Sequence, residues 1–261
     1  MIFETSESCI YPCRRLYQFF VYPEVSQEVE NTIIKEMAEM MRENNFSLLA
    51  PLKLLLKSEH FFDQSFYNTL IKSPLEFTFS IYKEFDLFNG ELRVWIQEEN
   101  KEYYYSDGER PDLFPQKLVD EISRSYFFFS NLYWNIGDQG LRLFEPPSVS
   151  GWPAYYQAPV YDLFWVNSVT VKKRKQTSES ATRWGVWLEN GVHIRFNLKN
   201  YLDTFKSPNN LEALLTEMQD RFLGAPIPER AKSRIKSSVL GDKNDQYWNQ
   251  LVDAYLVDPT S

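Results

Sequence analysis

The sequence predicts a mainly α protein, a multi-helix globular domain that carries one or two small β-hairpins. Apolar residues recur at helical spacing along most of the 261-residue chain, and two short stretches alternate as strands do. Only nine glycines are present, which disfavours an architecture with many tight turns. Aromatic residues make up 16% of the chain, so large rings should dominate a sizeable core.

The short, regular connections favour a single domain over residues 1–261. A subdivision near residue 176 is the alternative. Residues 1–175 would then form a helical core with an aromatic-rich loop, and residues 176–261 a hairpin followed by three helices.

Four helices are predicted before the first strand. They are expected over residues 11–22, 27–44, 48–58 and 74–85. Pro12 should lie in the first turn of the first helix, where proline is tolerated. Ser73, Pro74 and Glu76 match the start of the fourth helix, with a serine cap, a proline at the first position and a glutamate at the third.

Two hairpins are predicted on either side of one long helix. Residues 92–97 pair with 103–105 in the first, and residues 184–189 with 192–197 in the second. Asn190-Gly191 joins the second pair, because a type I′ turn needs two residues with positive φ. In the predicted register Trp187 faces Ile194, which places His193 on the solvent side.

The helix between the hairpins should run from Pro115 to about residue 135. Residues 126–134 are apolar nearly all round, which predicts a buried central helix. Three more helices close the chain. They are expected to begin at Ser207-Pro208, at Pro228 and at Asn244 or Asp245.

The charge distribution disfavours nucleic acid as a partner. The net charge is −8, and the only basic cluster is residues 172–175, which we expect in a solvated loop. No signal peptide opens the sequence, and no segment reaches the ~18 apolar residues of a membrane span. The chain as it stands is therefore expected in the cytoplasm.

Few residues suggest metal or nucleophilic chemistry. Cys9 and Cys13, four residues apart on a helix, are interpreted as small buried hydrophobes. His60, beside Glu59 and Asp63, is interpreted as a hydrogen-bonded residue at a helix end, with a base or ligand as the alternative. No cofactor and no metal are predicted.

The motifs of the common enzyme classes are missing from the sequence. There is no glycine-rich phosphate loop, no zinc-type histidine pair and no nucleophile elbow. Carboxylates are plentiful, so an Asp/Glu pair like that of glycosidases stays open, although nothing selects one. No catalytic residue is predicted. The missing motifs favour a protein that is not an enzyme.

The stretch 144–165 is the least ordinary part of the chain, with four prolines, one glycine and many rings. We call it the aromatic loop. Its rings could stack on a glycan or peptide, with two amides adding hydrogen bonds. The candidate binding residues are Trp152, Tyr155, Tyr156, Gln157, Tyr161, Trp165 and Asn167. The alternative is that these rings pack on the central helix.

The aromatic loop also contains residues that resemble the signature of a known family. Residues 143–153 (LFEPPSVSGWP) and 165–174 (WVNSVTVKKR) resemble the signature of the bacterial family called domain of unknown function 1800. The insert 154–159 (AYYQAP) resembles its members from Bacteroidota, and residues 14–22, 58–63 and 72–74 agree with the family. The positions that match its signature, for which structural roles are expected, are Pro146, Pro147, Gly151, Pro153, Arg174, Lys72 and Pro74.

The resemblance implies a largely helical protein without an established activity. This chain departs from the family where Leu141 follows Gly140, since members usually carry glutamine there. Members are also typically longer, so we expect a fragment, an internal start or a shortened member that covers the C-terminal part.

Three functions remain open at this stage. The first is a non-catalytic helical structural or interaction module, which the missing enzyme motifs favour. The second is a module that binds a glycan or a peptide through the aromatic loop, and the third is a hydrolase with an Asp/Glu pair. The partner is accordingly a glycan or another protein.

Overall fold

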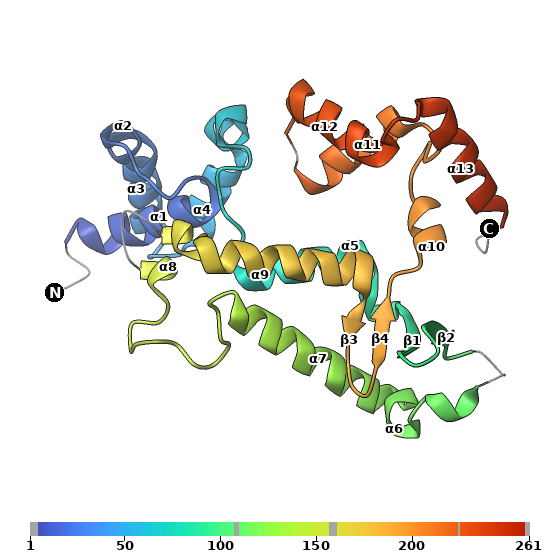
Figure 1. The fold of residues 1–261 in the computed structure, drawn as a ribbon. Helices are drawn as coiled ribbons and strands as arrows, with labels where there is room; N and C mark the ends of the chain where they lie inside the picture. Colours follow the sequence, from blue (N-terminus) through green and yellow to red (C-terminus); the bar gives the residue numbers. More distant parts are fainter. Residues whose placement is uncertain (1–4, 107–109, 157–160, 224, 259–261) are drawn as a thin grey trace. The chain divides into compact units, whose positions relative to one another are not determined.

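The computed structural model describes residues 5–106, 110–156, 161–223 and 225–258. Within these ranges the protein is mainly helical with one small antiparallel sheet, which confirms the predicted fold class (Figure 1). Its contacts separate two compact units. Unit 1 comprises residues 1–71 and 150–164, and unit 2 comprises residues 72–149 and 165–261. Position 176, considered above as a boundary, lies inside a helix of unit 2.

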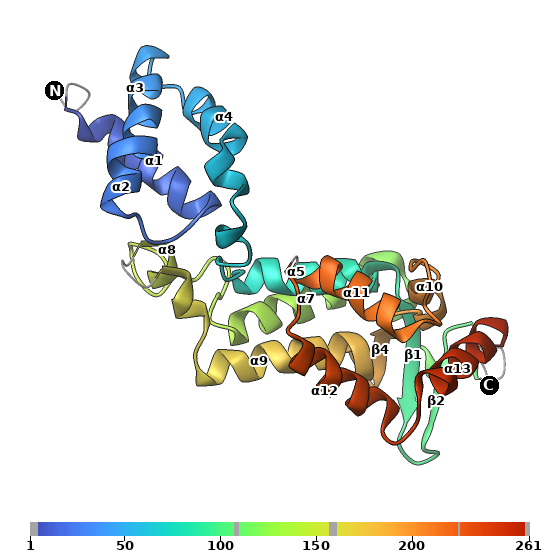
Figure 2. The same ribbon diagram turned by 90° about the horizontal axis from the view of Figure 1, so that it is seen from above.

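Unit 1 is a small helical bundle. Its α-helices are α1 (Glu7–Phe20), α2 (Gln27–Val29), α3 (Lys35–Glu43), α4 (Leu49–Lys57) and α8 (Pro153–Tyr156) (Figures 1 and 2). A π-helical segment, Glu30–Ile34, joins α2 to α3, so the predicted helix 27–44 is continuous. α1 begins earlier than predicted, and Pro12 therefore lies inside the helix rather than in its first turn.

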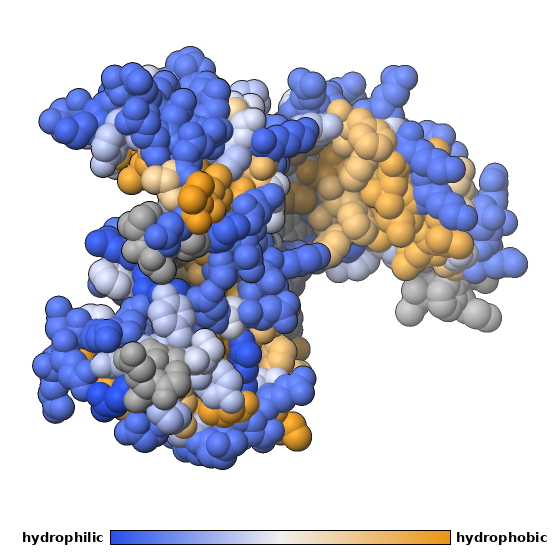
Figure 3. Space-filling model, turned by 90° about the vertical axis from the view of Figure 1, so that its right-hand side faces the viewer, coloured by the Kyte–Doolittle hydropathy of each residue, from blue (hydrophilic) through white to orange (hydrophobic). Residues whose placement is uncertain are grey.

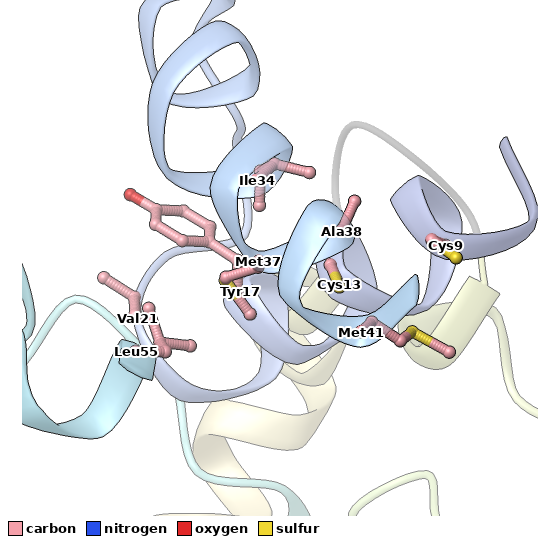
Figure 4. Packing of buried hydrophobic residues seen from close by; sticks show 9 residues of the cluster. All are labelled: Cys9, Cys13, Tyr17, Val21, Ile34, Met37, Ala38, Met41 and Leu55. Atoms are coloured by element: carbon pink, nitrogen blue, oxygen red, sulfur yellow. The ribbon is translucent and has the colours of Figure 1, made fainter. Parts of the chain in front are cut away.

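The core of unit 1 lies where α1, α3 and α4 meet (Figure 4). Cys9 and Cys13 both point into it and are free thiols, which confirms their interpretation as small buried hydrophobes. Burial raises the pKa of the Cys13 thiol to about 11, so this sulfur stays protonated near neutral pH. One surface of unit 1 is apolar as well, and Leu48, Leu49 and Phe62 are exposed there. The broad orange area on the fainter side of Figure 3 belongs to this unit.

Three long helices of unit 2 pack around its core, which contains polar as well as apolar side chains. They are α5 (Pro74–Glu84), α7 (Glu121–Asp138) and α9 (Ser168–Glu179), and the short α6 (Gln116–Val119) precedes α7. The capping box at Ser73 and Glu76 is present as predicted, with Pro74 as the first residue of α5. At the centre Gln139 is fully buried and donates hydrogen bonds to Thr78 of α5 and Thr177 of α9.

The prediction that α7 is buried on all sides is wrong. Phe128, Leu132 and Ile136, spaced four residues apart, form its buried face. Ile122, Tyr126 and Phe129 are instead exposed, and so is Trp134. The reason is geometric: α7 contacts α5, α9 and one strand, which together cover a single face of the helix. Apolar composition alone does not reveal how many faces of a helix are covered.

The prediction that residues 172–175 form a solvated loop is also wrong, because they lie in α9. Asn167 begins this helix by accepting hydrogen bonds from the backbone N–H groups of Val169 and Thr170. Two of the basic residues then make defined contacts. Lys173 forms an ion pair with Asp138 at 2.7 Å, and Lys175 pairs with Glu179 one turn along α9.

The sheet of unit 2 has the order β2-β1-β4-β3, with every neighbouring pair antiparallel. Its strands are β1 (Glu91–Ile96), β2 (Lys101–Tyr104), β3 (Val186–Trp187) and β4 (Val192–Arg195). Both hairpins were predicted and are confirmed. The turn of the second has positive φ at Asn190 and Gly191, as its sequence requires.

The predicted register of the second hairpin is wrong by one residue. Trp187 pairs with His193 rather than with Ile194, because the connection contains one more residue than a two-residue turn. This register places Trp187 on the same face as His193, and His193 is not a surface residue, since its side chain is 1% exposed. β4 lies between β1 and β3, and its first three residues are all buried.

Four helices follow the sheet. They are α10 (Leu198–Leu202), α11 (Leu211–Phe222), α12 (Glu229–Leu240) and α13 (Asp245–Val257). Asn244 caps α13 and Gly241 ends α12, as predicted, whereas Asn210 rather than Ser207 caps α11. Across the described ranges, none of the helices combines the length and the apolar character needed to cross a membrane.

Candidate functional site

Three tryptophans meet in a hollow of about 430 Å³ beside the sheet of unit 2, which we call the tryptophan pocket. Its lining residues come from every strand of the sheet and from a π-helical segment, Ser180–Trp184, at the end of α9. They are Trp95, Glu102, Arg183, Trp184, Trp187 and Arg195. All three indole rings are exposed.

Gly185 allows two of these tryptophans to flank the same hollow. Its φ is +86°, a backbone conformation in the region that only glycine adopts readily. There is also no room for a side chain, since a Cβ would lie 2.5 Å from Cδ2 of His193 and 2.9 Å from the carbonyl oxygen of Ile194. The chain can therefore turn closely against β4 between Trp184 and Trp187.

His193 lies directly beneath the tryptophan pocket. Its ring packs against that of Trp187, with the centroids 4.5 Å apart, and its Nε2 lies 3.6 Å from Oε1 of Glu102. Burial lowers the pKa of His193, although the negative charge of Glu102 acts in the opposite direction. We therefore expect a neutral imidazole at pH 7.

Glu102 is held as a carboxylate by two arginines. Nη1 of Arg195 donates to it at 2.8 Å and Nη1 of Arg93 at 3.1 Å. Burial alone would raise the pKa of Glu102, but these hydrogen bonds and charges outweigh it and keep the pKa below its ordinary value. Glu102 is thus an acceptor of hydrogen bonds and a poor proton donor.

The tryptophan pocket has two arginines, and the guanidinium group of Arg183 is the one that is not paired with a carboxylate. It lies over the ring of Trp184, 4.5 Å from the centroid, and its side chain is exposed. Within the described ranges it forms no ion pair, whereas Arg195 is tied to Glu102 and to the backbone carbonyl of Arg183. The donors of Arg183 are therefore available to a ligand.

The candidate residues of the aromatic loop are divided between the units. Trp152, Tyr155 and Tyr156 belong to unit 1, where the two tyrosines are exposed and Trp152 is half-buried. Trp152 meets Tyr155 edge to face, with centroids 6.4 Å apart, and Arg15 donates to the backbone carbonyl of Tyr155. Gln157 and the ring of Tyr161 lie outside the described part of the chain.

The remaining candidates of the aromatic loop belong to unit 2 and have structural surroundings. Trp165 is 5% exposed, so its ring is not offered to solvent. The side-chain oxygen of Asn167 accepts the hydrogen bonds that begin α9. The loop thus supplies two exposed tyrosines and a half-buried tryptophan in unit 1, rather than a platform of five rings.

The residues of the family signature in unit 2 join α9 to α5. Arg174 donates to the backbone carbonyl of Lys72 at 2.7 Å and lies over the ring of Phe77, 4.8 Å from the centroid. The amine of Lys72 donates to Ser80, and Pro74 begins α5. Arg174, Lys72 and Pro74 therefore help to position two helices against each other.

The other signature positions lie in the connection itself. Pro146 and Pro147 are exposed, and Phe144 beside them is also almost fully exposed. Packing of this segment on the central helix was expected, but these side chains are not buried. Gly151 has a φ of +89°, as a turn there requires, and Pro153 begins α8.

His60 is hydrogen-bonded at the end of a short 3₁₀ helix, as the sequence suggested. Its Nε2 and the hydroxyl of Tyr17 are 2.8 Å apart, and burial raises the pKa of Tyr17 to about 12. In the ranges that the structure describes, no three side chains among His, Cys, Asp and Glu are arranged to hold a metal ion.

The tryptophan pocket was not predicted from the sequence. Its residues are scattered from position 95 to position 195, and no motif connects them. The hairpin that brings Trp187 to it was predicted, but in a register that put His193 on the surface. Assigning the two predicted hairpins to one sheet could have revealed the cluster, since β1 and β4 are neighbouring strands.

The model of one protein family matches residues 1–260, and its description is "Protein of unknown function (DUF1800)". The chain belongs to this family, as the resemblance in the aromatic loop indicated. The comparisons with curated proteins and with solved structures returned no match.

Proposed function

We propose that the protein is a non-catalytic binding module and that it takes a carbohydrate in the tryptophan pocket. The interaction module is the function that the sequence favoured. The glycan was also considered there, with the aromatic loop as its site, and the new element is the place of binding. The single observation that carries the proposal is the gathering of Trp95, Trp184 and Trp187 around one hollow that also has charged groups in its wall.

The composition of the tryptophan pocket suits a sugar. Flat indole faces pack against the apolar C–H faces of a sugar ring, while its hydroxyls need donors and acceptors close by. Arg183 supplies donors and Glu102 supplies acceptors at the same hollow. Its volume of about 430 Å³ lies in the range of small-molecule sites.

A cation is a less suitable ligand for this pocket. Aromatic cages that bind quaternary ammonium groups leave their ring faces open to the cation. Here the charge of Glu102 is already paired with two arginines, and Arg183 adds a further positive charge to the wall of the pocket. A bound cation would meet two guanidinium groups, whereas a neutral or acidic sugar would not be repelled.

The hydrolase with a carboxylate pair has less support. Its general acid would need a raised pKa, so that it stays protonated near neutral pH. In the described ranges, the carboxyl groups with shifted pKa values are all shifted downward. They are Asp63, Glu99, Glu102 and Glu217. Binding without turnover is therefore the function that we propose.

A glycan array followed by titration calorimetry tests the proposal on the full chain. The Trp184→Ala variant should bind the selected glycan at least tenfold more weakly, because a stacking ring is lost; tenfold corresponds to about 1.4 kcal/mol. Tyr247→Ala is the matched control, since this ring of α13 is exposed and does not line the tryptophan pocket.

The control variant should bind as the unchanged protein does. Circular dichroism of both variants establishes that they are folded. If no glycan on the array binds, or if Trp184→Ala binds as tightly as Tyr247→Ala, the proposed function is contradicted.

A further inference from the structure

A second hollow, between α7 and α9, shares one lining residue with the tryptophan pocket. This hollow measures about 420 Å³, and Trp184 lines both. Its other walls are mostly polar. They include Asn135 and Asp138 of α7, Lys173 and Gln176 of α9, and Ser180.

A third hollow, of about 270 Å³, lies beside Trp134 and Phe127 of α7. It shares Asn135 and Asp138 with the second hollow, as the second hollow shares Trp184 with the tryptophan pocket. We call the whole the long groove. Trp95 and Trp187 line its first hollow and Trp134 lines its third, and every part of it lies in unit 2.

The exposed tryptophans of the protein coincide with the long groove. Among the described residues, the tryptophans classed as exposed are Trp95, Trp134, Trp184 and Trp187, and each lines one of the three hollows. An exposed indole leaves a large apolar surface in water. Four such rings along one groove indicate a surface that a ligand covers.

Two rings of the long groove, Trp134 and Trp184, are held in place by neighbouring side chains. Tyr133 meets Trp134 edge to face, with centroids 5.3 Å apart, and Arg142 lies 5.7 Å from the centroid of Trp134. Arg183 contacts Trp184 in a similar way. Rings positioned before binding lose less conformational entropy when a ligand stacks on them.

The middle of the long groove offers uncharged hydrogen-bonding groups. In the ranges described, the amide of Gln176 and the hydroxyl of Ser180 have no hydrogen-bond partner within the protein. The charges nearby are largely compensated, since Lys173 pairs with Asp138 at 2.7 Å. Amides and hydroxyls between aromatic platforms match the alternation of hydroxyls and C–H faces along a sugar chain.

We infer that the long groove binds a linear oligosaccharide of several units, with Trp134 as a stacking platform outside the tryptophan pocket. The inference rests on the proposed function and specifies its ligand. Several sugar rings in series would occupy the three hollows, and each ring added beyond the tryptophan pocket would gain contacts along α7 and α9.

An extended peptide is the competing ligand, and the construction of the groove disfavours it. Peptides in extended form are commonly held by hydrogen bonds to the free edge of a strand. The middle of the long groove is made by two helices, α7 and α9, whose backbone groups are paired along each helix. Only side chains are available to the ligand there.

Titration calorimetry with oligosaccharides of two to six units tests the inference. The probes are cello-, chito- and polyuronate oligosaccharides, and the series selected by the glycan array is used. The affinity should rise at least tenfold from two units to six. Trp134→Ala should lower the affinity for six units at least fivefold and leave the affinity for two units unchanged.

Two further variants complete this test. Trp134→Phe keeps a ring and should fall between the unchanged protein and Trp134→Ala. Tyr126→Ala removes another exposed ring of α7 that does not line the groove, and it should bind every length normally.

Equal affinity for two and six units, or equal loss at both lengths in Trp134→Ala, would overturn the inference. The proposed function would survive that result as long as short sugars still bind through Trp184. If instead no sugar binds and a peptide array yields ligands that depend on Trp134, the inference and the proposed function both fail.

Discussion

The aromatic loop and the long groove use aromatic residues in opposite ways. The loop concentrates its rings within 22 consecutive residues, yet the fold distributes them over two units and buries Trp165. The groove collects tryptophans that are far apart in the sequence and leaves all of them exposed. Density along the chain therefore did not indicate where rings gather in space.

The two regions also differ in what fixes their backbone. Prolines and Gly151 shape the aromatic loop locally, and there is open space around Gly151. In the long groove, strand pairing and helix packing position each ring, and a Cβ on Gly185 would lie within 2.9 Å of three atoms of β4. A ligand site needs such rigid support, because its affinity depends on groups that are already in place.

The two glycines provide the strongest test of this difference in support. Both have φ near +90°, so alanine strains the backbone at either position. Gly185→Ala should destabilise the protein by about 3 kcal/mol or more, because its Cβ would also overlap His193 and a carbonyl oxygen of β4. Gly151→Ala should cost roughly 1 kcal/mol, the strain alone.

Urea unfolding followed by circular dichroism measures both glycine variants against the unchanged protein. Gly185→Ala should in addition abolish glycan binding, whereas Gly151→Ala should retain it. If the two substitutions lowered the free energy of unfolding equally, the close packing of Gly185 in the groove would be contradicted.

A smaller effect is expected from pH, through His193 under the tryptophan pocket. The folded protein lowers the pKa of His193, so below the ordinary value of about 6.5 the unfolded chain binds the proton more readily. Stability should consequently fall as the pH decreases from 7 to 5.

His193→Phe should lose much of this pH dependence, since phenylalanine fills a similar space without a proton to gain. Thermal unfolding at a series of pH values measures it. An unchanged slope between pH 7 and pH 5 in the variant would show that His193 does not carry the effect. Below pH 5 the protonation of Glu102, whose pKa is lowered, should destabilise both proteins.

Local sequence patterns were sufficient for the helices and hairpins but not for the site. The capping box at Ser73, the turn at Asn190 and the cap at Asn244 are each set by a few neighbouring residues, and each was predicted. The exposed face of α7 was missed, because it depends on which elements cover the helix.

The register of the second hairpin was missed for a related reason. A single additional residue in its connection placed Trp187 beside His193, whose ring it packs against and whose side chain is buried. The tryptophan pocket then requires β4 to pair with β1 across a long stretch of chain, and α9 to end beside them. Pairings at such separation leave no local trace in the sequence, so local patterns predicted neither the pocket nor the groove.

Hydrogen exchange with and without the selected hexasaccharide tests the central claim most directly, since it compares both aromatic regions in one experiment. We predict slower exchange in residues 92–104, 130–139 and 176–195, which build the long groove, and unchanged exchange in residues 150–156 of the aromatic loop. Slower exchange in residues 150–156 with none in the groove would contradict the account.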